Sequence, residues 1–151
     1  MREAGPADVY TLFELEKAAS SAGLSHVFPA DIPFPDDDVM ARWALVLEEP
    51  GVTVLLDCED DVPVAYAAFG QGWLRHFGVL PRCWGSGRAQ RLHAQVLARS
   101  AALAAPVTDL WVLVDNHRAR AFYERLGWRD AGTRDAEVFA PHPTKMRMVR
   151  T

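Results

Sequence analysis

The chain has 151 residues, about the size of one ordinary domain, and 50% of them are hydrophobic. This composition excludes a disordered chain, and a net charge of −4 argues against a nucleic-acid partner. No apolar run is long enough for a membrane span and the first residues lack an export signal, so we expect a single cytoplasmic domain over residues 1–151 with no membrane partner. The two cysteines, Cys58 and Cys83, indicate reduced thiols rather than a disulfide scaffold.

The first third of the chain predicts two helices joined by a long loop. Gly5-Pro6-Ala7-Asp8 suits a helix start, because proline is tolerated at the first position and Asp8 favours the positive end of the helix dipole. Residues 20–35 contain three prolines and predict a long loop, and long loops in compact domains are usually functional. Asp36-Asp37-Asp38 begins a second helix that stops at Pro50. Four positions follow helical spacing in the first helix, and only the last is polar: Val9, Leu12, Phe13 and Glu16.

The middle of the chain predicts three strands, because apolar runs over residues 52–57, 62–69 and 73–79 are separated by two short turns. Such short turns imply antiparallel neighbours.

The last third alternates helices with strands. We expect a helix over 89–103 and a short helix over 119–126 that ends at Gly127. Residues 110–114 are continuously apolar, which predicts a strand covered on both faces. Two more strands are expected over 128–134 and 145–150. This order of elements predicts a mixed α/β domain.

A glycine-rich turn, Trp84-Gly85-Ser86-Gly87-Arg88-Ala89, lies between the third strand and the following helix. Glycine permits a tight turn and a close ligand approach, and the N–H groups of a helix start bind phosphate. An ordinary turn and helix entry is the simpler alternative. The turn is neither a dinucleotide fingerprint nor a P-loop, because the third glycine and the Gly-Lys-Ser/Thr sequence are missing.

Two segments resemble the GNAT superfamily of acyl-CoA-dependent N-acetyltransferases. The first is Phe77-Gly78-Val79-Leu80-Pro81 with the glycine-rich turn, similar to a strand ending Val-x-Pro before Gln/Arg-x-x-Gly-x-Gly/Ala. Trp84 stands in the Gln/Arg place, which is a departure from that pattern. The second, from Asn116 to Trp128, is similar to the family's Asn-x-x-Ala-x-x-Phe/Leu-Tyr-x-x-x-Gly-Phe stretch. The resemblance implies the GNAT fold: a mixed, mostly antiparallel twisted sheet of six or seven strands flanked by about four helices.

The resemblance also implies an acetyl-CoA site at the end of the third strand, without a metal. The backbone of Phe77 and Val79 would pair with the pantetheine arm, and the amides of the glycine-rich turn would hold the pyrophosphate. Arg88 would add a charged contact, or else be a solvated helix arginine. Asn116 is expected to cap its helix and to contact the cofactor. The implied cofactor-binding residues are Phe77, Val79, Trp84, Gly85, Ser86, Gly87, Arg88, Ala89 and Asn116.

For catalysis, Tyr123 resembles the family's general-acid tyrosine, although its place on an apolar stripe also fits a core residue. No general base is evident. Arg75 and Trp73 occupy the third-strand places where the family often has one, so a water chain or an unidentified carboxylate stays open. His76 lies one residue off and should face away unless a bulge shifts it. Arg75 would instead bind an acidic group of the substrate.

The acceptor is expected to be a primary amine of a small molecule, attacked without a covalent enzyme intermediate. His26 and Phe28 lie in the loop that the family uses to cover the acceptor site, or are ordinary loop residues. A catalytically silent acyl-CoA-binding sensor or interaction module stays open as a function of another class, and so does a homodimer.

Overall fold

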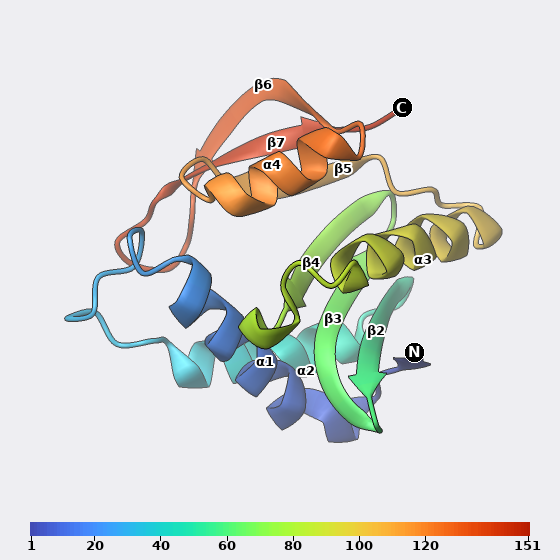
Figure 1. Ribbon diagram of the computed structural model, residues 1–151, viewed down its shortest axis with the longest axis horizontal. Coiled ribbons are helices and arrows are strands. Elements are labelled where there is room, and N and C mark those ends of the chain that lie inside the picture. Colours follow the sequence, from blue (N-terminus) through green and yellow to red (C-terminus); the bar gives the residue numbers. More distant parts are fainter.

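Seven strands form one twisted sheet in the order β1-β2-β3-β4-β5-β7-β6 in this computed structural model, which describes residues 1–151 (Figure 1). Only the β4–β5 pair is parallel, so the mixed, mostly antiparallel sheet predicted from the resemblance is confirmed. The strands are β1 (Arg2–Glu3), β2 (Val52–Glu59), β3 (Val62–Gly70), β4 (Trp73–Val79), β5 (Asp109–Leu113), β6 (Arg129–Ala136) and β7 (Thr144–Val149).

Four helices cover the two faces of the sheet. They are α1 (Val9–Gly23), α2 (Asp36–Glu48), α3 (Arg88–Ala102) and α4 (His117–Arg125), with short 3-10 turns η1 (Pro6–Asp8) and η2 (Pro81–Cys83). Side chains alternate along β3, so that Ala67 and Phe69 join the core beneath α3, and Tyr66 and Ala68 join the core beneath α1 and α2. No helix is both long and apolar enough to cross a bilayer.

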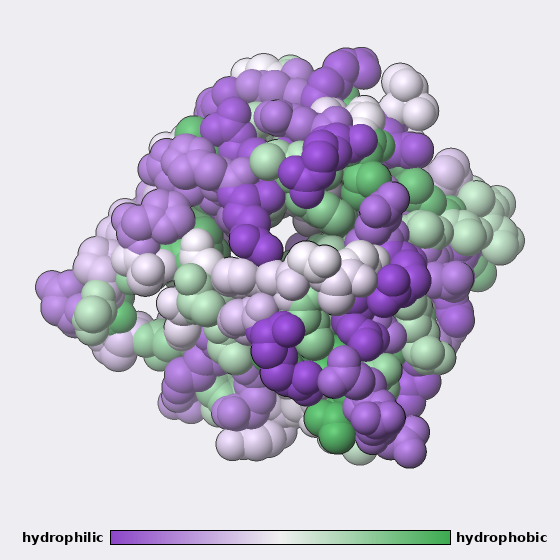
Figure 2. Space-filling view, in the orientation of Figure 1, coloured by the Kyte–Doolittle hydropathy of each residue, from purple (hydrophilic) through white to green (hydrophobic).

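The sheet divides between β4 and β5. These two strands pair only at Trp73 with Asp109 and at Leu74 with Leu110, whereas β4 stays paired with β3 as far as Val79. Beyond Leu74 the two strands therefore separate. Figure 2 shows an open passage through the molecule at this place, between α4 and the turn that precedes α3.

The predicted elements are all present, but two details differ from the sequence-based expectations, and the burial of a third element had not been predicted. Strand β1 was not predicted, because two residues carry no periodicity. The expectation that residues 110–114 are covered on both faces is wrong: Leu110 and Val112 are buried, whereas Trp111 and Leu113 are only half-buried and line a cavity. Strand β6 is exposed along its whole length at the edge of the sheet.

Candidate active site

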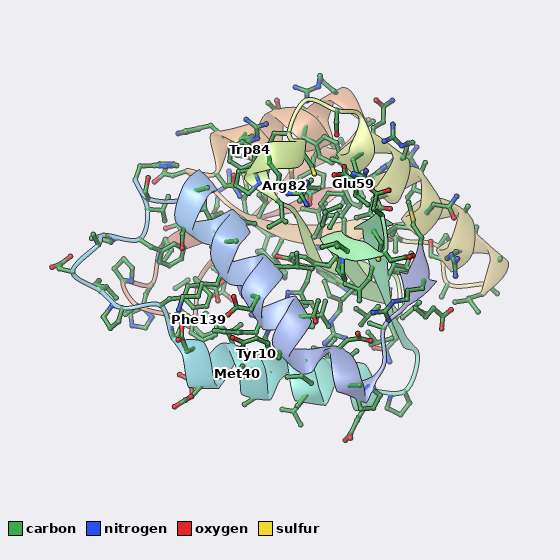
Figure 3. The ribbon with its side chains drawn as sticks, turned by 60° about the horizontal axis from the view of Figure 1, so that its bottom comes forward. Tyr10, Met40, Glu59, Arg82, Trp84 and Phe139 are labelled. Atoms are coloured by element: carbon green, nitrogen blue, oxygen red, sulfur yellow. The ribbon has the colours of Figure 1, made fainter.

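A cavity of about 870 Å³ lies between the α1–α2 pair and the diverging strands β4 and β5. The loop that joins α1 to α2 forms one wall, and residues 137–140 of the β6–β7 loop form another. Phe139 of this second loop packs on the core beneath α1 and α2 and lies beside the start of α2 in Figure 3. The cavity therefore has walls from both halves of the sheet and from two loops far apart in the sequence.

The glycine-rich turn has the backbone shape that its glycines predict. Gly85 and Gly87 have φ angles of +74° and +80°, in the left-handed region that disfavours side chains. The Ser86 hydroxyl donates to the Cys83 carbonyl at 2.5 Å, which holds the turn in place. No hydrogen bond within the chain uses the backbone N–H of four residues here, which are Gly85, Gly87, Ala89 and Gln90. These free donors at the start of α3 can hold an anion.

The free edge of β4 leads from this turn into the opening between the strands. Leu80 donates its backbone N–H to Val64 of β3 at 2.9 Å. Because backbone groups alternate in direction along a strand, those of Phe77 and Val79 face the gap toward β5. The Val79 carbonyl there accepts a 3.0 Å hydrogen bond from the Trp84 indole. The pairing of Phe77 and Val79 with a pantetheine arm stays a prediction. The Val79 carbonyl, one of the backbone acceptors for that arm, is already bonded to Trp84.

Trp84 also ties the turn to helices on both sides of the opening. The Arg118 guanidinium of α4 lies 3.8 Å from the centre of the indole ring, and Gly23 at the end of α1 lies against the ring edge. The departure from the family pattern at this position therefore has a structural role.

Aromatic rings of β4 and α4 meet beside the opening. Phe77 stacks on Phe122 with ring centroids 5.7 Å apart and meets Tyr123 edge-on at 6.3 Å. Tyr123 lines the cavity, and its hydroxyl makes no hydrogen bond within the chain. Burial raises the pKa of Tyr123 above its usual range, so the phenol is protonated at neutral pH.

Asn116 caps α4 as predicted, because its Oδ1 accepts the Ala119 N–H at 3.3 Å, and it also lines the cavity. The two loop residues lie nearby. His26 donates from Nε2 to the Asp115 carbonyl at 2.7 Å, and Phe28 lines the cavity itself. The loop between α1 and α2 thus reaches the start of α4 across the opening.

Both arginines that were expected to meet anionic ligands are ion-paired within the chain. Arg75 forms two 3.0 Å hydrogen bonds to the Glu49 carboxylate at the end of α2. Arg88 bonds to Asp57 at 2.8 Å and to Glu59 at 3.2 Å, so the alternative of a solvated arginine is wrong. Figure 3 shows Arg82, a second partner of Glu59, beside Trp84. Ligand binding by Arg75 or Arg88 stays a prediction that requires these ion pairs to rearrange.

A β-bulge sets the direction of His76. The pairing of β3 with β4 slips by one residue at Arg75, so that His76 lies opposite Ala68 and faces α1 and α2. The His76 ring lies 4.9 Å from the Trp43 ring and borders the cavity. Burial, aided by the charges of Arg42 and Arg75, lowers the pKa of His76 to about 3. The imidazole is therefore neutral at physiological pH and a weak base.

The chain has clear relatives among known proteins. A model of the acetyltransferase (GNAT) family matches residues 11–128. Uncharacterised N-acetyltransferases of Mycobacterium tuberculosis and Mycobacterium bovis are 34% identical to it over 115 residues, covering 73% of this chain and 74% of each relative. The chain belongs to the GNAT family of acetyltransferases. It is thereby an acyl-CoA-dependent N-acetyltransferase.

Solved GNAT structures share the fold over nearly the whole chain. A GCN5-related N-acetyltransferase from Rhodopseudomonas palustris matches with a TM-score of 0.79 and 19% identity, over 99% of this chain and 93% of that one. The PaiA N-acetyltransferase from Thermoplasma acidophilum, solved in complex with coenzyme A, matches with a TM-score of 0.72 and 11% identity, over 97% and 95% of the two chains.

Two residues that the sequence did not single out as functional complete the cavity of this GNAT enzyme. Glu16 of α1 and Tyr66 of β3 both line it. Glu16 is ion-paired with Arg42, and its pKa is raised because burial outweighs the effect of that partner. The available signal was the polar Glu16 on an otherwise apolar helix stripe. No group of three or more His, Cys, Asp or Glu side chains is arranged to hold a metal ion.

Proposed function

We propose that this GNAT enzyme transfers the acetyl group of acetyl-CoA to the primary amine of a small molecule, by direct attack of the amine on the thioester. One observation carries the proposal: the opening between β4 and β5 joins a glycine-rich turn with free backbone N–H groups to a walled cavity. A cofactor lying along β4 would present its thioester to an acceptor in that cavity.

The donor half is supported by backbone groups. The free N–H groups at the start of α3 would bind the pyrophosphate, and the edge of β4 at Phe77 and Val79 would receive the pantetheine arm. Asn116 lies at the opposite side of the opening. The coenzyme A complex of the PaiA N-acetyltransferase supports a donor site of this kind in this fold.

The chemistry requires a neutral amine, a stabilised oxyanion and a protonated leaving group. The nitrogen lone pair forms a bond to the carbonyl carbon, and the C–S bond then breaks with its electron pair on sulfur. A backbone N–H near Val79 would stabilise the oxyanion. Tyr123, kept protonated by burial beside Phe77, would donate its proton to the thiolate.

The shape of the cavity favours a small acceptor. Its volume of about 870 Å³ lies within the range of small-molecule sites, and the β6–β7 loop forms one of its walls. An apolar wall would contact the body of the acceptor, and it is formed by Phe28, Ile32, Phe34, Val138 and Phe139. The walls formed by the β6–β7 loop and by the loop between α1 and α2 would restrict the approach of a polypeptide to β4.

Thermal unfolding with acetyl-CoA, CoA, NAD and ATP in parallel tests the donor half. A ligand at 100 times its Kd adds about 2.7 kcal/mol to the free energy of unfolding, which raises Tm by several degrees. We expect this shift with acetyl-CoA and CoA only. The absence of a shift with either at millimolar concentration would contradict the proposed acetyl-CoA site.

A further inference from the structure

We infer that Glu16 is the general base that removes a proton from the amine of the acceptor substrate. We also infer that the Tyr66 hydroxyl, which lies over Gly78 of β4, holds this amine beside the thioester. The inference rests on the proposed function and assigns the general base that the sequence did not reveal. It uses two residues from elements on the acceptor side of the sheet, α1 and β3.

The contact between Tyr66 and Gly78 places the hydroxyl against β4. A Cβ atom on Gly78 would lie 2.5 Å from the Tyr66 hydroxyl and 2.5 Å from its Cε1, closer than any real contact. Gly78 has no positive φ, so the Tyr66 ring is the evident reason for a glycine there. The hydroxyl therefore lies over the backbone between Phe77 and Val79, where the proposed function places the thioester.

The Glu16 carboxylate lines the cavity and is hydrogen-bonded within the chain to Arg42. Its Oε1 accepts this hydrogen bond, and the buried indole N–H of Trp43, which has no other partner, lies near the same carboxylate. The side chain is 14% exposed, and the exposed part borders the cavity. A partly buried carboxylate at the wall of a cavity can accept a proton from a bound ammonium group.

The charged and titratable surroundings of Glu16 come from three elements. Arg42 of α2 stabilises the carboxylate, as does the nearby indole N–H of Trp43. Burial is the main cause that raises the Glu16 pKa, and Glu137 of the β6–β7 loop raises it a little further. Tyr66 of β3 lies within electrostatic range of Glu16 and also of Tyr123. All three side chains, Glu16, Tyr66 and Tyr123, line the same cavity.

The other side chains of the cavity that could accept a proton are less suited than Glu16 to act as the general base. His76 is a weak base, because burial and two neighbouring arginines lower its pKa to about 3. Asp38 is exposed at the outer part of α2. Glu137 accepts the backbone N–H of Val138 at 2.8 Å through Oε1 and belongs to the loop that forms one wall of the cavity.

The reaction balances with these groups. The acceptor enters as RNH3⁺ and Glu16 takes one proton, which frees the lone pair to form the N–C bond. The C–S bond breaks with its electrons on sulfur, and Tyr123 protonates the sulfur. The second proton lost by nitrogen replaces that of Tyr123, and Glu16 returns its proton to solvent. The products are RNHCOCH3, CoASH and one released proton.

The test compares Glu16→Gln with Glu14→Gln, and Tyr66→Phe with Tyr10→Phe. Glu14 and Tyr10 are exposed residues of the same helix α1, outside the cavity. Thiol release is measured against pH, using acetyl-CoA and a primary amine that the wild type acetylates. We expect Glu16→Gln to lower kcat about 10²- to 10⁴-fold and to abolish the acidic limb of the pH profile. Tyr66→Phe should raise the KM for the amine about tenfold and leave the KM for acetyl-CoA unchanged.

Other results would contradict either the role of Glu16 or the proposed function, and the two cases can be told apart. A Glu16→Gln variant with wild-type rate and acidic limb would overturn the inference and leave Glu16 as a structural partner of Arg42. If this variant does not fold, Glu16→Asp should keep the acidic limb and move its midpoint, and an unmoved midpoint would equally overturn it. A wild type that releases no thiol with any amine contradicts the proposed function itself, which is a different failure.

Discussion

The Trp84 indole N–H donates a 3.0 Å hydrogen bond to the Val79 carbonyl and so joins the glycine-rich turn to the free edge of β4. This contact fixes the relative position of the two backbone segments that would hold the phosphates and the pantetheine arm. The Arg118 guanidinium lies over the face of the same ring. The Trp84 side chain therefore links the glycine-rich turn, β4 and α4.

Trp84→Phe should lower the free energy of unfolding by about 1 kcal/mol, because it removes the hydrogen bond and keeps an aromatic ring. Arg118→Gln is a separate test of the ring face and should cost about 0.5–1 kcal/mol at this exposed site. Urea denaturation of the two variants and of the wild type measures both changes in unfolding free energy. An unchanged stability of Trp84→Phe would show that the bond to Val79 makes no net contribution.

Gly87→Ala should weaken acetyl-CoA binding and destabilise the fold. Gly87 has a φ of +80°, a conformation that costs other residues about 1–2 kcal/mol, and an added Cβ would lie 3.2 Å from the Arg91 side chain. The change would also disturb the free N–H groups at the start of α3.

Gly5→Ala is the matched control for Gly87→Ala. Gly5 has a φ of −127° and open space around its Cα, so the variant should behave as wild type. Isothermal titration with acetyl-CoA measures both variants. Equal affinity of Gly87→Ala and Gly5→Ala would contradict a phosphate site at this turn.

Tyr123→Phe should reduce kcat about 10²- to 10⁴-fold without changing the affinity for acetyl-CoA. The substitution removes only the hydroxyl, and the ring contact with Phe77 is retained. Steady-state thiol release and a binding titration separate the two effects. A kcat within twofold of wild type would show that Tyr123 acts only as a core residue.

Arg88→Gln separates two roles of one side chain. The Arg88 guanidinium bonds to the buried Asp57 and to Glu59, so its loss should cost about 2 kcal/mol of unfolding free energy. Arg125→Gln, at an exposed position at the end of α4 and away from the glycine-rich turn, is the control. Weaker acetyl-CoA binding at unchanged stability would instead favour the pyrophosphate contact.

The stability of the enzyme should fall as the pH decreases below about 6.5. His76 has a folded-state pKa of about 3 against 6.5 in the unfolded chain, so only the unfolded state binds a proton between these values. The loss is at most about 1.4 kcal/mol per pH unit for this group. His93, with a pKa lowered to about 4 by burial, acts in the same direction.

The variant His76→Phe should have a shallower dependence of unfolding free energy on pH between about 3 and 6.5. Urea denaturation at a series of pH values gives this slope. The exposed residue His142 provides the control variant His142→Gln, which should keep the wild-type slope. An identical slope in all three proteins would mean that His76 is not buried as described.

The donor half of the site was more predictable from sequence than the acceptor half. Glycines that need positive φ and an asparagine helix cap leave local signals, so the turn at Gly85 and Gly87 and the cap at Asn116 could be placed in advance. Arg88 and Arg75 are paired with carboxylates 31 and 26 residues away, a tertiary contact that spacing does not encode. The direction of His76 depends on a bulge in the pairing with β3.

Product analysis distinguishes acetyl transfer to a small primary amine from the other activities open to this enzyme. The wild-type enzyme is incubated with acetyl-CoA and a panel of small primary amines and, separately, lysine-containing peptides, followed by mass spectrometry. We expect a mass gain of one acetyl group on at least one small amine, with equal release of CoA and little modification of the peptides. Binding of acetyl-CoA without any acetylated product, or acetylation of peptides alone, would contradict it.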